Sequence, residues 1–220
     1  MEAQWAHLLQ EISNNALETS VYTGRPMLSK RVMNAMAKVP RIAFVPDNLR
    51  FDAYINQPLS IGYGQTISQP FIVALMTDLL DLTPTDRVLE IGSGSGYQSA
   101  ILAELVAEVH SVELVEDLAH SAARRLAKLG YRTIHIYHGQ GRRGWPQAAP
   151  YAAILVAAAS PDIPPHLVEQ LSVYGRMVIP VCCGHSGIHQ KLLRIVKQRD
   201  HTLKQQRCLS VAFVPLVGRD

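Results

Sequence analysis

The 220-residue chain has few cysteines, no long hydrophobic run and little excess charge. Its three cysteines, Cys182, Cys183 and Cys208, form neither a C-x-x-C pair nor a disulfide framework, and free thiols are typical of a reducing compartment. No apolar run approaches the ~18 residues of a membrane span. The first residues have neither the basic start nor the apolar core of a secretory signal. These absences predict a soluble, cytoplasmic protein with no membrane partner.

The balance of charges argues against a large basic surface of the kind that binds nucleic acid. With 21 lysines and arginines against 18 aspartates and glutamates, the formal net charge is only +3. The segment 191–207 is locally basic, but edge strands commonly carry lysine and arginine because these charges block aggregation. We therefore interpret this segment as a solvated sheet edge and expect no nucleic-acid partner.

The chain does have a glycine-rich corner at 88–97, which reads V-L-E-I-G-S-G-S-G-Y. Glycine at every second position permits a sharp turn with positive φ and lets a backbone approach a ligand closely. A helix is predicted from about Gln98. Strand, glycine turn and helix N-terminus together expose N–H donors at the carboxyl end of a strand, where open α/β sheets hold cofactors. The corner therefore predicts a nucleotide-like ligand.

Two acids and the glycine spacing narrow the kind of ligand. Tyr97 stands where the dinucleotide fingerprint needs its last glycine, which disfavours NAD. Glu90 precedes the first glycine and is placed to accept a bond from a ligand ammonium or to order the turn. The predicted strand 109–113 ends in Glu113, about 20 residues after the glycines, at the position that bonds ribose hydroxyls. A turn used only for packing remains an alternative, but both acids favour a nucleoside with a cationic amino-acid tail.

The rest of the chain predicts one α/β domain over 1–220. Alternating strands and helices are typical of a doubly wound, mostly parallel, Rossmann-like sheet. We expect a helical cap and lid loop over 1–70 and a cofactor-binding core over 71–220. The predicted helices lie at 5–17, 29–37, 71–82, 116–129 with Gly130 as C-cap, and 163–171. The predicted strands lie at 88–91, 109–113, 133–137, 152–157 and 176–181.

Two segments fall outside this alternation. Residues 191–197 and 208–217, with a turn near Asp200-His201 between them, predict an antiparallel pair that closes the sheet. Residues 45–70 are rich in Pro, Gly, Asn and Gln and show little periodicity. A loop of this length inside a compact domain is usually functional.

Together these segments resemble the protein-L-isoaspartate O-methyltransferase family. The run V-L-E-I-G-x-G-x-G is similar to motif I of class I S-adenosylmethionine-dependent methyltransferases, and G-Q-T-I-S-Q-P at 64–70 resembles a loop of that family's active site. The second motif is the more specific. The resemblance extends from about Arg31 to Val217 and is carried by 31–41, 44–46, 64–70, 88–97, 150–151, 157–164, 179–181 and 213–216.

The resemblance implies methyl transfer from S-adenosyl-L-methionine to the free α-carboxylate of L-isoaspartyl residues, the first step in repairing damaged proteins and peptides. S-adenosyl-L-homocysteine is the implied product, and we expect a monomer. A carboxylate with a pKa near ~4 is already ionised, so no general base is required. Ser68 is implied as the catalytic residue that holds this carboxylate, with Thr66 and Val181 also in contact with the peptide. The implied cofactor-binding residues are Gln65, Thr66, Ile67, Glu90, Gly92, Ser93, Gly94, Gly96, Glu113, Leu114, Gln140 and Gly141.

Three positions depart from the family pattern. Gln140 replaces an aspartate that accepts from the adenine amino group, so a neutral bond replaces a charge-assisted one and affinity is expected to fall. Ala152 replaces an acid near the start of a strand. Cys182-Cys183 replace glycine and create C-C-G-H-S-G-I-H. Its spacing matches no structural zinc pattern and adjacent cysteines chelate one ion poorly, so we expect no metal site.

Two other functions remain open at this point. The first is a class I methyltransferase with a different carboxyl or hydroxyl acceptor. The second is a catalytically impaired S-adenosylmethionine-binding paralogue, inactivated through Gln140 and Ala152. Residues 157–161 read A-A-A-S-P instead of the Asn/Asp-Pro-Pro-aromatic motif of nucleic-acid amine methylases, which disfavours amino methylation.

Overall fold

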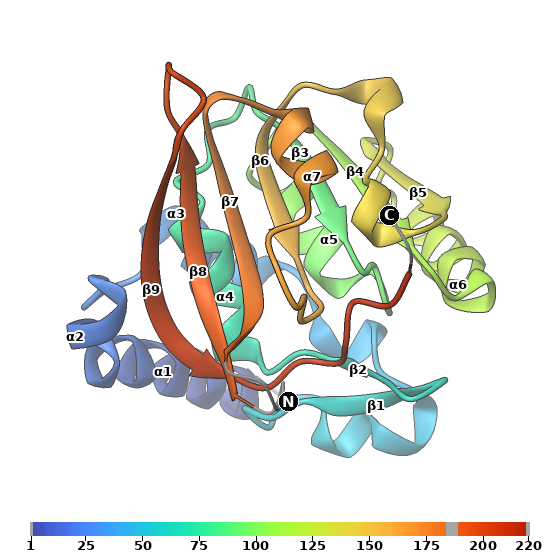
Figure 1. Cartoon of the computed structure of the whole chain (residues 1–220). Helices are drawn as coiled ribbons and strands as arrows, with labels where there is room; N and C mark the ends of the chain where they lie inside the picture. The colour runs from blue at the N-terminus through green and yellow to red at the C-terminus, as the bar shows by residue number, and fades with distance from the viewer. Residues whose placement is uncertain (1, 184–188, 219–220) are drawn as a thin grey trace.

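A central sheet organises the computed structural model, which describes residues 2–183 and 189–218 (Figure 1). In these residues the sheet has seven strands in the order β5-β4-β3-β6-β7-β8-β9. The first five are parallel, and β8 is antiparallel to both of its neighbours. This confirms the mostly parallel sheet with antiparallel C-terminal strands. The strands are β3 (Arg87–Ile91), β4 (Glu108–Glu113), β5 (Ile134–His138), β6 (Tyr151–Val156), β7 (Leu171–Cys183), β8 (His189–Lys197) and β9 (Leu203–Val211).

Alternate strand residues face two separate hydrophobic clusters. Val88 and Leu155 pack into a cluster that includes α4 (Pro70–Leu79), α5 (Tyr97–Ala103) and the N-terminal helices. Their neighbours Leu89 and Ile154 pack into a second cluster on the other face. Helices therefore wind both faces, as the alternating pattern predicts. The second face carries α7 (Pro165–Gln170), η3 (Gly141–Arg143) and η4 (Pro146–Ala148), and α6 (Glu116–Lys128) packs on β4 and β5.

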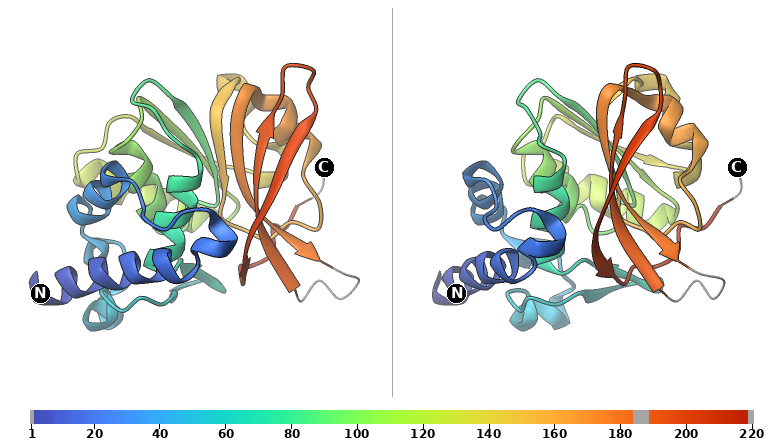
Figure 2. Two further views of the ribbon diagram at one scale, coloured as in Figure 1. Left: turned by 90° about the vertical axis from the view of Figure 1, so that its left-hand side faces the viewer. Right: turned by 60° about the vertical axis from the view of Figure 1, so that its left-hand side comes forward.

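An N-terminal cap packs against α4. It consists of α1 (Glu2–Glu18), α2 (Ser20–Thr23), α3 (Lys30–Lys38), η1 (Arg41–Ala43) and η2 (Asp47–Asp52). The turned views show these blue elements on one side of the sheet, where α2 lies against β9 (Figure 2). Ser29 caps α3 by accepting from the Val32 amide. No helix in the described part of the chain is long and apolar enough to cross a membrane.

The segment 45–70 is more ordered than its lack of periodicity predicts. Besides η2, it forms a hairpin of β1 (Leu59–Gly62) and β2 (Gln65–Ile67), which runs along the carboxyl edge of the sheet (Figure 1). Strands of four and three residues are too short to show a period. The hairpin turns through Tyr63 at φ 56°, between two glycines that also have positive φ.

Several element boundaries predicted from the sequence are wrong. The strands predicted from 176 and from 208 begin earlier, at Leu171 and Leu203, and the helix predicted over 71–82 ends at Leu79. The last strand ends at Val211, and residues 212–218 leave the sheet instead of continuing a strand to 217. Their apolar residues face the end of β6, where the Leu216 amide donates to the Ala159 carbonyl. The helix predicted over 163–171 ends at Gln170, because Leu171 pairs with Tyr151 and begins β7.

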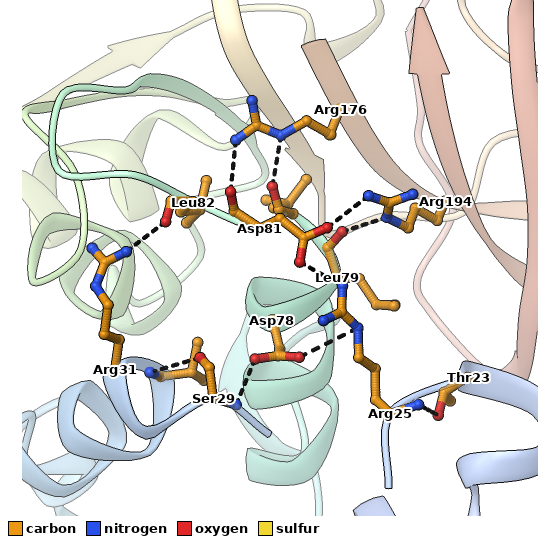
Figure 3. Close-up of polar contacts among 12 residues, drawn as sticks. Thr23, Arg25, Ser29, Arg31, Asp78, Leu79, Asp81, Leu82, Arg176 and Arg194 are labelled. Carbon is orange, nitrogen blue, oxygen red and sulfur yellow. Dashed lines mark hydrogen bonds and ion pairs between the residues drawn. The ribbon is translucent and has the colours of Figure 1, made fainter. Parts of the chain in front are cut away.

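An arginine cluster joins the cap, α4 and the antiparallel strands (Figure 3). Arg194 Nε donates to the Leu79 carbonyl at 2.7 Å, and its NH2 binds Asp81 Oδ2 at 2.7 Å. Arg176 donates to the Leu80 and Asp81 carbonyls, and Arg25 binds the other Asp81 oxygen. Cations and N–H donors at a helix C-terminus satisfy carbonyls that have no intrahelical partner. The cluster fixes the end of α4, whose first turn follows Ser68.

Candidate functional site

The glycine corner forms the sharp loop that its sequence predicts. After β3, the φ angles of Gly92, Gly94 and Gly96 are 91°, 52° and 87°. A Cβ on Gly94 would lie 3.2 Å from Ile61 Cδ1 of the hairpin. Positive φ and this close approach both require glycine. The loop therefore lies directly against β1, with the N-terminus of α5 behind it.

Glu113 fastens this loop to the end of β4. Its Oε2 accepts from the Gly94 amide at 2.8 Å and its Oε1 from the Val115 amide at 3.0 Å. A carboxylate has about four lone-pair sites, so each oxygen keeps an acceptor position. Glu113 is thus held rigidly and retains the capacity to accept from a hydroxyl pair.

Glu90 lies beneath the loop, fully buried, and does not line the cavity described below. The Ser99 hydroxyl donates to its Oε2, while Oε1 has no hydrogen-bond partner. Burial raises the pKa of Glu90 to about 7, against the opposing effect of hydrogen bonds from Ser111 and Ser99. Of the two roles that the sequence leaves open, this position fits ordering of the turn.

A cavity of about 640 Å³ brings the glycine loop and the 64–70 motif together. Pockets of this size hold small-molecule ligands and cofactors. Its lining includes Gly92, Ser93, Gly94 and Ser95 of the loop, and Glu113 and Leu114 at the end of β4. It also includes Gln65, Thr66 and Ile67 of β2 and Ser68 in the turn after it.

The Ser68 turn is held from behind by the cap. Arg41, on η1, donates from NH1 to the Ser68 carbonyl at 2.8 Å. Asn56 accepts from the Phe71 amide and donates to Asn15, which ties the first turn of α4 to α1. Ser68 itself is half-buried and lines the cavity. These contacts fix the backbone that carries its hydroxyl.

Four predicted site residues lie outside the cavity lining. Besides Glu90, these are Gly96, Gln140 and Val181. Gln140 is exposed, but the next residue, Gly141, lines the cavity and is packed so tightly that a Cβ would lie 2.5 Å from Ile91 Cγ2. Val181 forms a β-bridge with Ser160 at the end of β7.

The structure also adds residues that the sequence did not predict. Leu209 to Val217 form one wall of the cavity, and Asn15 and Thr19 reach it from the end of α1. Gln190 holds this wall with both amide atoms, accepting from the Phe213 amide and donating to its carbonyl. The run 213–216 was visible as part of the resemblance, but nothing in it indicated a place opposite the glycine loop.

The Cys182–His189 segment is described only in part, because residues 184–188 lie outside the described residues. Cys182 and Cys183 end β7, and His189 begins β8. Across residues 2–183 and 189–218, no group of three His, Cys, Asp or Glu side chains is arranged to hold a metal ion.

The lining of the cavity suits a nucleoside with an amino-acid tail. Its lining combines backbone amides of a glycine loop, an acid at the next strand end and apolar side chains from Ile91, Val112 and Leu216. The amides and the acid suit polar groups of ribose and an amino acid, and the apolar walls suit a flat base.

Comparison with known proteins agrees with this geometry. Residues 12–220 match the family model described as protein-L-isoaspartate(D-aspartate) O-methyltransferase. A protein from Polaromonas sp. (strain JS666) named protein-L-isoaspartate O-methyltransferase 2 is 50% identical over 96% of this chain and 100% of its own length. One from Cupriavidus necator, named protein-L-isoaspartate O-methyltransferase 1, is 48% identical over 98% of this chain and 83% of its own.

Solved structures share the fold over nearly the whole chain. A protein-L-isoaspartate O-methyltransferase superimposes with a TM-score of 0.85 at 25% identity, covering 97% of this chain and 66% of that one. A Plasmodium falciparum protein solved with S-adenosyl-L-homocysteine, described as a putative member of the same family, superimposes with a TM-score of 0.78 at 24% identity. That match covers 96% of this chain and 97% of the other.

Proposed function

Because the chain belongs to the protein-L-isoaspartate O-methyltransferase family, we propose that its cavity aligns S-adenosylmethionine with the α-carboxylate of an L-isoaspartyl residue. The protein is a methyltransferase that acts on isoaspartyl residues in damaged proteins and peptides. One observation is the main support for placing both the cofactor and the acceptor in this cavity. The glycine loop at 92–95 and the turn that carries Ser68 line the same cavity, so a cofactor and an acceptor held there are neighbours.

The reaction asks for alignment and exclusion of water. The cofactor supplies a methyl group on a positively charged sulfur, which leaves as a neutral sulfide. An α-carboxylate is already ionised at neutral pH, so the chain need not remove a proton. Holding the carboxylate oxygen in line with the methyl group is the main requirement, and such alignment contributes ~7–11 kcal/mol in model systems.

Cofactor binding is assigned to the loop and its surroundings. In this proposal Glu113 accepts from the ribose hydroxyls and Gly141 lies against the adenine, with Gln140 at its edge. Gln65 to Ile67 face the amino-acid end, where β2 meets the loop, and Glu90 supports the loop from beneath. The remaining proposed cofactor-binding residues are Gly92, Ser93, Gly94, Gly96 and Leu114.

Ser68 holds the acceptor in this proposal. Its hydroxyl lines the cavity on a backbone fixed by Arg41, so it offers one well-placed donor to a carboxylate oxygen. Thr66 and Val181 contact the peptide around the isoaspartyl residue. Leu209 to Val217 form the opposite wall and shield the reacting atoms from water.

We also propose that the enzyme works in the cytoplasm as a monomer, without nucleic-acid or membrane partners. Its three cysteines are free, which suits a reducing compartment. The Leu209 to Val217 wall completes the cavity from within one chain, so no second copy is needed to form the site.

A matched peptide pair tests the function. Purified enzyme is given radiolabelled S-adenosylmethionine with an isoaspartyl peptide or its normal aspartyl twin, and calorimetry measures S-adenosylhomocysteine affinity. We expect labelling of the isoaspartyl peptide alone and micromolar or tighter cofactor binding. Equal labelling of both peptides, or none despite cofactor binding, would mean that Gln140, Ala152 and the two cysteines accompany a different acceptor. No cofactor binding at high micromolar concentration would contradict both methyltransferase hypotheses.

A further inference from the structure

Arg41 is a fully buried arginine directly behind the Ser68 turn, with 0% exposure. Its NH1 donates to the Ser68 carbonyl at 2.8 Å and its NH2 to the Gln57 carbonyl at 3.1 Å. The guanidinium carbon lies 5.2 Å from the centre of the Tyr97 ring, and Tyr97 also lines the cavity. Arg41 therefore touches two segments of the cavity wall from inside the protein.

No carboxylate neutralises this arginine within residues 2–183 and 189–218. Its hydrogen-bond partners are neutral carbonyls, and its Nε has no partner, nor does the nearby Tyr97 hydroxyl. Burial lowers the pKa of Arg41 to about 10, so the side chain remains charged at neutral pH. Burial raises the pKa of Tyr97 to about 12, so the phenol stays neutral.

A buried charge of this kind is costly unless an opposite charge compensates it. Arg31 offers a contrast, because it too binds two backbone carbonyls, those of Leu82 and Leu105, but on the exposed side of the cap away from the cavity. Holding carbonyls alone therefore does not require burial. The position of Arg41 behind Ser68 indicates that the compensating anion comes from the cavity side.

We propose that Arg41 is a positioning residue that supplies the positive charge for the acceptor carboxylate, a role that rests on the proposed function. It acts in two ways. It fixes the Ser68 backbone through the carbonyl, and its field favours an anion at the Ser68 hydroxyl. Because the guanidinium is fully buried, the effective dielectric constant around it is lower than in solvent and its attraction for an anion is correspondingly stronger.

The reaction itself determines where this charge acts. During transfer an oxygen lone pair of the carboxylate forms the new O–CH3 bond, the S–CH3 pair returns to sulfur, and the carboxylate becomes a neutral ester. Arg41 therefore attracts the bound carboxylate more strongly than the transition state or the ester product. Removing this charge should therefore raise KM and leave kcat unchanged or slightly higher, because the interaction that is lost is stronger in the bound ground state than in the transition state. Because the ester is neutral, this attraction is lost on methyl transfer, so the product is held less tightly than the substrate and leaves more readily.

Three variants separate charge from scaffolding. Arg41→Gln keeps hydrogen-bond donors but removes the charge, Arg41→Lys keeps the charge but loses the planar fork, and Arg31→Gln is the matched control outside the cavity. Each enzyme, loaded with S-adenosylhomocysteine, is titrated with an isoaspartyl peptide and with its analogue whose α-carboxylate is a neutral carboxamide. The carboxylate-to-amide preference is compared with melting temperature and with KM and kcat.

We expect wild type, Arg41→Lys and Arg31→Gln to prefer the carboxylate peptide by about tenfold or more. Arg41→Gln should lose most of this preference and raise KM about tenfold, with kcat within about threefold. The proposal is overturned if Arg41→Gln and Arg41→Lys weaken both peptides equally, because a scaffold would produce that result.

A wild-type measurement keeps the test valid if Arg41→Gln fails to fold. A preference produced by a buried charge persists in 0.5 M salt, whereas one produced by surface lysines is screened away, since the Debye length there is only about 4 Å. Loss of the preference in salt would therefore also overturn the role of Arg41. Failure of the proposed function is distinguishable, because the wild-type enzyme would then not methylate the isoaspartyl peptide at all.

Discussion

The Tyr63 hydroxyl donates a 2.7 Å hydrogen bond to Asp117 Oδ2, which joins the tip of the β1–β2 hairpin to the first turn of α6. Just before its tip, the hairpin passes over the glycine loop, where Ile61 of β1 lies against Gly94. The hydrogen bond to Asp117 raises the pKa of Tyr63, so the phenol remains a donor at neutral pH. One exposed contact thus fastens a cavity-lining hairpin across the loop.

Removing this contact should speed cofactor release. Tyr63→Phe keeps the ring but loses the donor, so the hairpin opens more often. We expect S-adenosylhomocysteine to dissociate about threefold faster, measured by stopped-flow displacement. Tyr22→Phe, on an exposed tyrosine of α2, serves as control and should match wild type. An unchanged release rate in Tyr63→Phe would show that the hairpin does not limit exit.

Ser68→Ala should reduce turnover before it affects cofactor binding. Without the Ser68 hydroxyl the bound carboxylate is less often in line with the methyl group, so kcat for the isoaspartyl peptide should fall about 10- to 100-fold. The Kd of S-adenosylhomocysteine should stay within about twofold, because Ser68 belongs to the acceptor end of the cavity in our proposal. Ser13→Ala, on the exposed face of α1, is the control. Full activity in Ser68→Ala would transfer the acceptor contact to another residue.

Gln140→Asp should tighten cofactor binding. Gln140 is exposed next to Gly141, which lines the cavity, and a carboxylate there would give the adenine amino group a charge-assisted bond. We expect about 1 kcal/mol, or about fivefold in the Kd of S-adenosylhomocysteine by calorimetry. Gln147→Asp adds the same charge on exposed η4 and should change the Kd little. Equal effects of the two variants would indicate general electrostatics, and no effect would place Gln140 away from adenine.

Glu90→Gln should change how stability depends on pH. The pKa of Glu90 is raised to about 7 in the fold but lies near ~4.3 in an unfolded chain, so the fold retains a proton that the unfolded chain has lost. The free energy of unfolding of wild type therefore falls as pH rises from ~4.3 through about 7. The free energy of unfolding of Glu90→Gln does not fall for this reason, because glutamine does not titrate. Between pH 5 and pH 8 the variant should gain about 2 to 3 kcal/mol relative to wild type in urea unfolding. Parallel curves for the two proteins would contradict a neutral buried Glu90.

Much of the fold could be predicted from the spacing of residues that are close in the sequence. The long periodic segments that became α1, α3, α4 and α6 were predicted within a few residues, because an apolar stripe at helical spacing is a property of adjacent residues. The glycine corner was equally readable, since Gly92 and Gly94 adopt positive φ that other residues rarely reach.

Long-range contacts account for what the sequence did not reveal. The sequence around Arg41 does not distinguish it from a surface arginine. Its burial depends on Gln57 and Ser68, which are 16 and 27 residues away and whose carbonyls accept its hydrogen bonds. The run after Val211 alternates like a strand, yet its apolar side chains serve the cavity and not the sheet. Gln190 fixes Phe213 from a neighbouring strand, a contact that no spacing rule suggests.

The cavity wall formed by Leu209 to Val217, which includes Leu216, affects when the cavity can form during protein synthesis. Leu216 bonds Ala159 and lies against Gly141, so the cavity is closed by a segment that follows the glycine loop by more than half the length of the sequence. Synthesis proceeds from the N-terminus, and the glycine loop and the Ser68 turn leave the ribosome long before Leu216 does. A nascent chain that has emerged only as far as β8 therefore lacks the cavity wall formed by Leu209 to Val217. A complete cavity therefore requires that residues 209–217 have been synthesised and have folded back against the glycine loop.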